Sequence, residues 1–118
     1  LSVIKERPVF GYGSAMEKKV LHERFLTNGL NFAANNNYDS HNQYLSLAIE
    51  FGAIGLCLFL FYLSSNVYFS LQKKDKISAM FFVSLILIGV FENLFKNNSG
   101  IIFIAFFSNI FLFCNQKK

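Results

Sequence analysis

The distribution of apolar and charged positions changes near residue 43. Residues 1–43 hold nine of the 18 charged side chains, and the chain beyond them contains three uncharged stretches of 22, 15 and 20 residues, at residues 51–72, 77–91 and 97–116. A helix that spans a bilayer needs about 20 mostly apolar residues, within a range of about 17–25. The pattern therefore predicts an all-α membrane protein with three transmembrane helices, at residues 44–70, 77–95 and 99–115.

The composition favours lipid over water around residues 44–118. This part holds 13 of the 16 phenylalanines, charged residues make up only 15% of the chain, and the mean hydropathy is +0.39. Soluble domains average about 25% charged residues. A soluble helical bundle is the alternative, but its helices would carry polar faces, whereas these stretches are apolar all round. Abundant large apolar residues exclude intrinsic disorder, and the presence of only two cysteines excludes a disulfide-rich secreted domain.

The positions of the basic residues predict how the helices are oriented. The net charge is +4, but the basic residues stand in short groups between apolar stretches, so we expect contact with membrane lipids and not with nucleic acid. Residues 72–76 hold three lysines and the C-terminal tail holds two, whereas residues 96–98 hold one. Short loops rich in lysine face the cytoplasm. This places the C-terminus in the cytoplasm and residues 1–43 on the outer side.

The outer segment contains one predicted helix and two candidate anion-binding arginines. Ser14 and Glu17 have the spacing of a capping box, and apolar residues follow at helical spacing, which predicts a short amphipathic helix over residues 14–27. Residues 28–40 are rich in asparagine and are expected to form a loop. Arg7 and Arg24 could each grip phosphate oxygens through two guanidinium N–H groups. The alternative is that they only solvate the surface.

The start of the first long apolar stretch carries the most informative pattern. Ser40 and Gln43 have the spacing of a second capping box, so we expect the helix to begin near His41. At 100° per residue, three small residues lie within about 40° of His41 on this helix, namely Ala48, Gly52 and Gly55. Small residues let another helix approach closely inside a membrane. The spacing predicts a tight helix contact directly below the histidine.

His41 is the candidate catalytic residue. The start of a helix carries partial positive charge, which disfavours a protonated imidazole and attracts anions. A neutral His41 could accept a proton, and a phosphate could bind the exposed N–H groups nearby. The alternative is a structural histidine at the membrane interface.

The other polar and sulfur side chains are expected to be structural. Glu92 and Lys96 stand four residues apart in an order that favours an ion pair on the second helix. His22 and Glu23 have no further ligand at metal-binding spacing, so we expect no metal site. Cys57 and Cys114 fall inside predicted helices, where we expect no disulfide.

The motif around His41 resembles the signature of O-antigen ligases. His41-Asn42, nine residues, Gly52, two residues and Gly55 match the family pattern H[NSQ]-x9-G-x-x-[GTY]. The segment Arg-Pro-Val-Phe-Gly-Tyr-Gly at residues 7–13 is similar to the one that leads into the family's large periplasmic loop. Because the chain begins with Leu1 and resembles the last part of such a protein, we expect it to be the C-terminal part of a larger membrane protein, inactive alone.

The resemblance implies a glycosyltransferase of the bacterial inner membrane. Family members take a glycan from undecaprenyl diphosphate on the periplasmic side, and ligases pass it to a sugar hydroxyl of the lipid A core, without a metal or cofactor. His41 matches the proposed base of the family. Arg7, Arg24 and Asn42 are the candidate diphosphate ligands. Residues 1–43 would be the end of the periplasmic loop, and residues 44–118 the closing transmembrane helices.

Other functions share parts of this pattern. O-antigen and exopolysaccharide polymerases, which use a growing glycan as acceptor, and protein O-oligosaccharyltransferases have the same motif. A transporter or a non-enzymatic membrane module is the alternative from a different class. Transporters often place charges in the middle of the membrane, whereas the charges here gather near the predicted outer interface.

Overall fold

The computed structural model describes residues 2–36 and 38–114, and this part of the chain is helical without a β-strand. The elements in order are α1 (Ser2–Glu6), α2 (Glu17–Thr27), α3 (Asn31–Asn35), α4 (Gln43–Gln72), α5 (Lys76–Phe91), the 3-10 helix η1 (Leu94–Lys96) and α6 (Asn98–Cys114). The all-α prediction is therefore confirmed. The predicted cytoplasmic tail, residues 115–118, lies outside the described residues.

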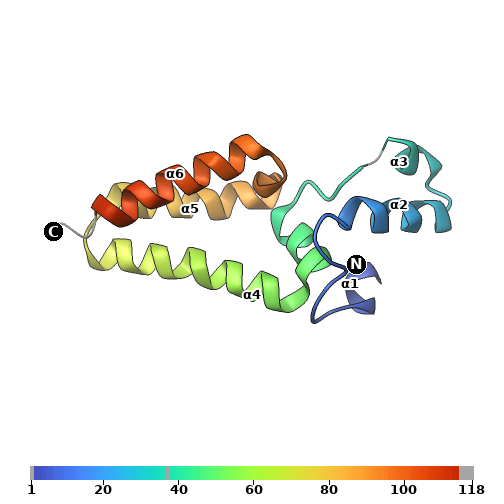
Figure 1. Ribbon diagram of the computed structural model, residues 1–118, viewed down its shortest axis with the longest axis horizontal. Helices are drawn as coiled ribbons and strands as arrows, with labels where there is room; N and C mark the ends of the chain where they lie inside the picture. Colours follow the sequence, from blue (N-terminus) through green and yellow to red (C-terminus); the bar gives the residue numbers. More distant parts are fainter. Residues whose placement is uncertain (1, 37, 115–118) are drawn as a thin grey trace.

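The molecule is elongated, with extents of 57 × 26 × 19 Å. Helices α4, α5 and α6 run side by side, and α1, α2 and α3 gather at the end where α4 begins (Figure 1). Two apolar clusters hold these parts together. One joins the three long helices through Leu63, Phe82, Leu85 and Ile104, and the other joins α1 and α2 to the first turns of α4 through Val3, Val20 and Ile49.

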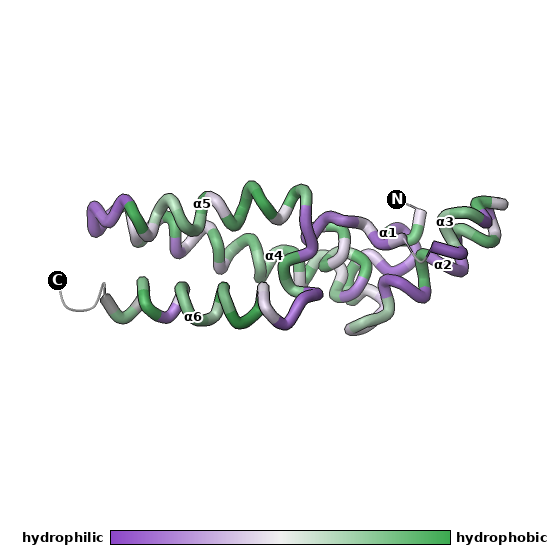
Figure 2. Tube along the Cα trace, turned by 90° about the horizontal axis from the view of Figure 1, so that it is seen from above, coloured by the Kyte–Doolittle hydropathy of each residue, from purple (hydrophilic) through white to green (hydrophobic). Residues whose placement is uncertain are grey.

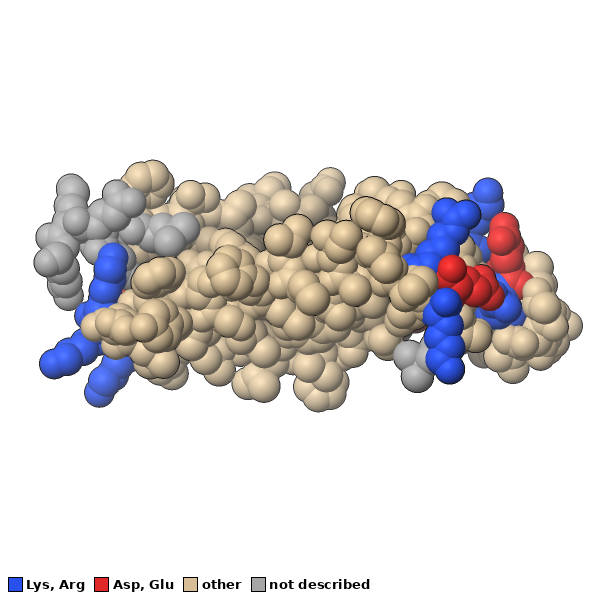
Figure 3. Space-filling view, turned by 90° about the horizontal axis from the view of Figure 1, so that it is seen from below, with Lys and Arg blue, Asp and Glu red and all other residues tan. Residues whose placement is uncertain are grey.

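The three long helices expose apolar surface over most of their length. Figure 2 shows hydrophobic residues along all three, with hydrophilic residues collected at the two ends. The face drawn in Figure 3 carries charged side chains at both ends and none across its middle. Among the described helices, α4 is long and apolar enough to cross a membrane, whereas α5 and α6 are shorter apolar helices. The structure thus supports one candidate span directly.

The second long helix ends earlier than the sequence predicts. Helix α5 stops at Phe91, and Glu92 has the extended backbone angles φ −140° and ψ 149°. The expected ion pair between Glu92 and Lys96 on one helix is therefore wrong, because the chain between them is not α-helical. Lys96 instead turns toward α2 and the loop before α4.

Both predicted capping boxes are also wrong. The outer helix begins at Glu17, with Met16 rather than Ser14 at its N-cap, and Glu17 uses its carboxylate elsewhere. Helix α4 begins at Gln43, and the side chain that caps it belongs to Asn42 rather than to Ser40. In addition, the predicted loop at residues 28–40 contains the short helix α3. Glu17 and Gln43 instead accept bonds from Ser46 and Phe95, which are distant in the sequence.

Candidate active site

Helix α4 is broken at Gly52, the first glycine of the motif. Gly52 has φ 64° and ψ −159°, which are not helical angles. In an unbroken helix, the amides of Ala53 and Ile54 would bond to the carbonyls of Ile49 and Glu50. The break leaves these four backbone groups without their helical partners, and a buried backbone group without a partner is costly.

The segment at residues 8–13 supplies partners for all four groups. The bonds run from Ala53 N to Pro8 O (2.8 Å), Ile54 N to Val9 O (3.4 Å), Tyr12 N to Ile49 O (2.9 Å) and Gly13 N to Glu50 O (2.8 Å). We call this contact between residues 8–13 and 49–54 the Gly52 clasp. It joins the two sequence patterns that carry the family resemblance into one structural unit.

The Gly52 clasp leaves no space for a side chain at two glycines. A Cβ atom on Gly52 would lie 2.3 Å from the Val9 carbonyl oxygen, and one on Gly11 would lie 2.5 Å from the Glu50 carbonyl. Both glycines also have positive φ, which glycine adopts without strain. Gly52 therefore permits close approach of a loop, not of a second helix.

The predicted stripe of small residues below His41 is consequently wrong. His41 lies outside α4, and the break at Gly52 changes the helical phase before Gly55. Ala48 and Gly52 are nevertheless buried, and Gly55 is partly buried against Phe51 of its own helix. Angular counting failed because it assumed one ideal helix from His41 onward.

His41 occupies an exposed turn just before α4. Its φ is +41°, a left-handed conformation that is uncommon for residues other than glycine. Its backbone N–H donates to Asp39 Oδ1 at 3.1 Å, and its Nε2 atom lies 3.4 Å from the same oxygen. The imidazole is 67% exposed. The ring therefore reaches solvent with a carboxylate beside it, rather than resting on the first turn of the helix.

Asn42 has a structural role that accounts for its polar atoms. Its Oδ1 atom accepts from the amides of Tyr44 and Leu45 at 3.0 Å, and its Nδ2 atom donates to Val90 O at 2.9 Å. The next residue, Gln43, is buried and accepts from the amide of Phe95. These bonds fix the start of α4 against the end of α5 and against η1. They leave Asn42 a weaker candidate for binding a diphosphate than the sequence suggests.

A buried carboxylate stands at the centre of the polar contacts around the motif. Glu17, on the first turn of α2, has no exposed surface. It accepts bonds from Ser46 Oγ at 2.5 Å and from Ser40 N at 3.0 Å, and it pairs with Lys96 Nζ at 2.5 Å. Lys96 Nζ also lies 3.3 Å from Asp39 Oδ2. We call Glu17, Lys96, Asp39 and His41 the Glu17 network.

The two carboxylates of this network are both stabilised in their charged form. Burial acts to raise the pKa of Glu17, but the bonds from Lys96, Ser40 and Ser46 outweigh it, so the pKa lies below its ordinary value. Burial likewise acts to raise the pKa of Asp39. The backbone amide of His41 and the ammonium of Lys96 outweigh it, and this pKa is lowered as well. The Glu17 and Asp39 carboxylates are therefore charged at neutral pH.

The sequence contains one indication of the Glu17 network, namely charged residues placed among apolar ones. On a helix, Glu17 shares a face with Val20 and Leu21, so a carboxylate interrupts the apolar side of the predicted outer helix. Lys96 similarly follows Leu94 and Phe95 and directly precedes an uncharged stretch. A charge placed among apolar residues needs a partner of opposite sign. Which partner each residue would find could not be read from spacing.

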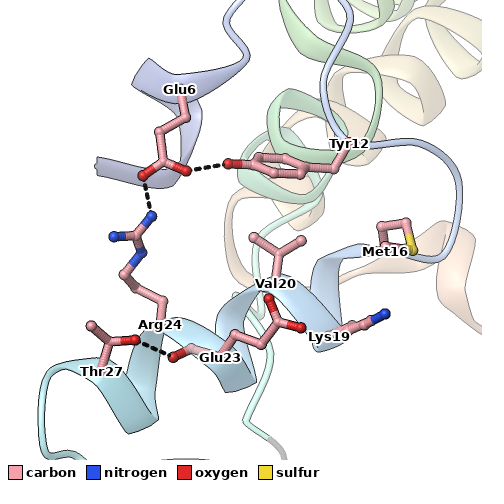
Figure 4. A pocket seen from close by; sticks show the side chains of 8 residues that line it. All are labelled: Glu6, Tyr12, Met16, Lys19, Val20, Glu23, Arg24 and Thr27. Carbon is pink, nitrogen blue, oxygen red and sulfur yellow. Dashed lines mark hydrogen bonds and ion pairs between the residues drawn. The ribbon is translucent and has the colours of Figure 1, made fainter.

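The two candidate arginines have different surroundings. Arg24 pairs with Glu6 Oε1, and Tyr12 donates to Glu6 Oε2 at 2.5 Å (Figure 4). The bonds from Tyr12 and Arg24 hold the pKa of Glu6 below its ordinary value. Arg7 is exposed, with its guanidinium carbon 5.2 Å from the centre of the Tyr12 ring, and it forms no ion pair with a residue that the structure describes.

The pocket beside Arg24 has a lining without net charge. It has a volume of about 320 Å³, and its lining includes two cations and two carboxylates, Lys19, Arg24, Glu6 and Glu23. These charges balance, as the close view in Figure 4 shows for residues from α1 and α2. Across the described residues, no group of three or more His, Cys, Asp or Glu side chains could hold a metal ion.

Comparison with known proteins identifies the family of this chain. A family model described as O-antigen ligase matches residues 1–60, half of the chain, and these residues include the Gly52 clasp, Glu17, Asp39 and His41. No curated protein and no solved structure matches the chain. The match and the motif agree, and we conclude that the chain belongs to the O-antigen ligase family, a superfamily of glycosyltransferase-like membrane enzymes.

Proposed function

We propose that the protein is an O-antigen ligase, which transfers a glycan from undecaprenyl diphosphate to a sugar hydroxyl of the lipid A core. Membership of the family supports this class of reaction. One observation carries the assignment of the base: His41 presents an exposed imidazole beside a carboxylate, just before α4, at the end of the bundle where α1, α2 and α3 gather. A group that takes a proton from a sugar must be reachable from solvent in this way.

The residues of the turn suggest how the transfer proceeds. A sugar hydroxyl is a poor nucleophile until a base removes its proton. Asp39 lies against Nε2 of His41, which directs Nε2–H toward the carboxylate and leaves Nδ1 to accept the proton. The acceptor oxygen then forms a bond to the anomeric carbon of the donor glycan. The bond from that carbon to the diphosphate breaks, and undecaprenyl diphosphate leaves with the electron pair.

Arg7 is the candidate that we retain for binding the diphosphate. It is exposed and carries a guanidinium that can bind phosphate oxygens through two N–H groups. Arg24 is already paired with Glu6, and the polar atoms of Asn42 are bonded to backbone groups. We therefore assign Arg24 and Asn42 to the support of the site rather than to the substrate.

The proposed topology places the site at the periplasmic face of the inner membrane. Helices α4, α5 and α6 would all span the bilayer, with residues 1–43 outside and the C-terminus in the cytoplasm. The lysine-rich turn between α4 and α5 lies at the opposite end of the bundle from α1 and α2, as this orientation requires (Figure 1). Helix α5 has 16 residues and rises only about 24 Å, so the bilayer would thin locally around it.

The test replaces His41 in the complete protein. His41→Ala is expressed in a bacterium whose own ligase gene is deleted, and lipopolysaccharide is separated on gels. We expect a bare core together with accumulated undecaprenyl-linked polymer, at an unchanged protein level. His22→Ala is the matched control, because His22 contacts the Ala34 carbonyl of α3, outside the Glu17 network, and is expected to support normal transfer. Normal transfer by His41→Ala would remove the catalytic assignment.

The same gels separate the ligase from its relatives. Deleting a ligase leaves long polymer on the lipid carrier and a bare core. Deleting an O-antigen polymerase instead leaves a core that carries a single repeat. A protein O-oligosaccharyltransferase would leave lipopolysaccharide unchanged and remove glycan from a protein.

A further inference from the structure

The structure links the exposed His41 turn to a buried ion pair on distant parts of the chain. We propose that Glu17 and Lys96 are positioning residues, which hold Asp39, and through it His41, in the geometry needed for transfer. This inference rests on the proposed function and goes beyond it, because neither residue belongs to the sequence motif. Glu17 comes from α2 and Lys96 from the connection between α5 and α6.

Lys96 is the residue that joins the buried part of the network to the exposed part. Its ammonium lies between two carboxylates, 2.5 Å from Glu17 Oε2 and 3.3 Å from Asp39 Oδ2. Along the contacts from Glu17 through Lys96 and Asp39 to His41, the exposed fractions of the side chains are 1%, 24%, 16% and 67%. The contacts therefore run from the interior to the reacting group.

Glu17 acts on the turn and not on a substrate. Its side chain has almost no exposed surface, and its two oxygens accept bonds from Ser40, Ser46 and Lys96. It is thus unavailable to a ligand. Its bond to the amide of Ser40 holds the peptide group between Asp39 and Ser40, while Asp39 holds the amide of His41 itself.

The strained backbone of His41 explains why such support is needed. A left-handed conformation is unfavourable for an L-residue with a side chain and persists where the surroundings enforce it. Asp39 provides this enforcement with one oxygen and contacts Lys96 with the other. Without Lys96, the Asp39 carboxylate would lose the contact at Oδ2 and keep the one at Oδ1, so the turn and the imidazole would be held less firmly.

The experiment measures transfer by the purified complete protein, with undecaprenyl-diphosphate-linked O-antigen as donor and lipid A core as acceptor. We expect Asp39→Asn to lower kcat about 10- to 100-fold, the range for a misplaced catalytic group, while the donor KM changes less than twofold. Lys96→Met should have a similar effect, and Lys96→Arg should recover most of the activity. Lys5→Met is the matched control, because Lys5 is an exposed lysine at the same end of the molecule.

Two further variants separate positioning from folding. Lys96→Met leaves the Glu17 carboxylate buried without its partner, which can prevent folding. The double variant Glu17→Gln with Lys96→Met removes both charges and should fold, yet it should still show the loss in kcat. Asp39→Asn in a His41→Ala background should cause no additional loss, since the positioned group is already absent.

The outcomes distinguish this inference from the proposed function. If His41→Ala is inactive while Asp39→Asn and the double variant keep wild-type kcat, the network only stabilises the fold and the positioning role is overturned. A change confined to donor KM would also overturn it. Full activity of His41→Ala would overturn the proposed base and the positioning role together. If the double variant does not fold, Lys96→Gln decides the question, because its amide can still donate to Glu17 while the charge that pairs with Asp39 is removed, and wild-type kcat in this variant would overturn the positioning role.

Discussion

Residues 1–42 contact helix α4 and its start at two places, one held by backbone hydrogen bonds and the other by charged side chains. At the Gly52 clasp, backbone amides and carbonyls of residues 8–13 replace the helical partners of residues 49–54, and these four hydrogen bonds use no side-chain atom. In the Glu17 network, charged side chains make the contact, and the backbone contributes only the amides of Ser40 and His41. The first contact requires the absence of a side chain, and the second requires a balance of charge.

These two contacts bound the same short length of helix. The His41 turn precedes Gln43, and the break at Gly52 follows Phe51. Between them α4 buries Gln43, Ser46, Ala48 and Ile49, whereas the part of α4 beyond the break exposes large apolar side chains such as Leu58 and Phe61. The first turns of α4 therefore belong to the proposed active site, and the remainder is the part that lipid would contact.

The largest effect on stability should follow from a side chain at the Gly52 clasp. Gly52→Ala adds strain of about 1–2 kcal/mol at positive φ and overpacking of about 1–3 kcal/mol against Val9. Gly29→Ala is the matched control, because Gly29 has φ +72° but no atom within 4 Å of the added Cβ, so only the strain remains. Thermal unfolding followed by circular dichroism in detergent compares the two. Equal losses would show that the close approach at Gly52 contributes nothing.

An intermediate effect is expected from the Glu17 network. Lys96→Met should destabilise the protein by about 2–3 kcal/mol, less than the 3–5 kcal/mol for a fully buried pair, because Lys96 is 24% exposed. Adding Glu17→Gln should restore part of the loss, since the unpaired buried charge is then removed. The measurement is a double-mutant cycle on unfolding free energies. Additive losses would mean that the two side chains do not interact.

Acid should weaken the Glu17 network while leaving the Gly52 clasp unaffected. The pKa values of Glu17 and Asp39 are lower in the folded protein than in the unfolded chain, so below about pH 4 the unfolded chain binds more protons. Their contribution is complete above the unfolded pKa and is lost as the pH falls through the folded pKa. Melting temperatures between pH 7 and pH 3 should therefore fall less for Glu17→Gln with Lys96→Met than for the wild type. Gly52→Ala should keep the pH dependence of the wild type.

The smallest effect is expected at the exposed ion pair between Glu6 and Arg24. Such pairs contribute little because solvent screens them and ordering two side chains costs entropy. Glu6→Gln should leave the melting temperature unchanged within error, although it removes the partner of Arg24 and the acceptor of Tyr12. A loss as large as that of Lys96→Met would show that this end of the molecule is held by its surface charges.

The sequence predicted the helices and the family because both depend on local information. Uncharged stretches of sufficient length are helical wherever they pack, and α4, α5 and α6 lie close to the predicted ranges. His41, Gly52 and Gly55 carry the family signature as letters at fixed spacing, and the match over residues 1–60 agrees with it. The sequence did not predict the physical roles of these residues, because spacing does not show whether the helix between them is continuous.

Only the tertiary structure decided which distant residues the motif contacts. The break at Gly52 is stable because residues 8–13, about 40 positions earlier, satisfy the four backbone groups that it frees. Lys96 pairs with Glu17 and Asp39, which lie more than 50 positions away in the sequence, and not with the nearby Glu92. Buried backbone groups and buried charged side chains both require a partner, and the sequence shows which residues have this requirement. The fold selects the partner, because only the fold brings distant segments within bonding distance.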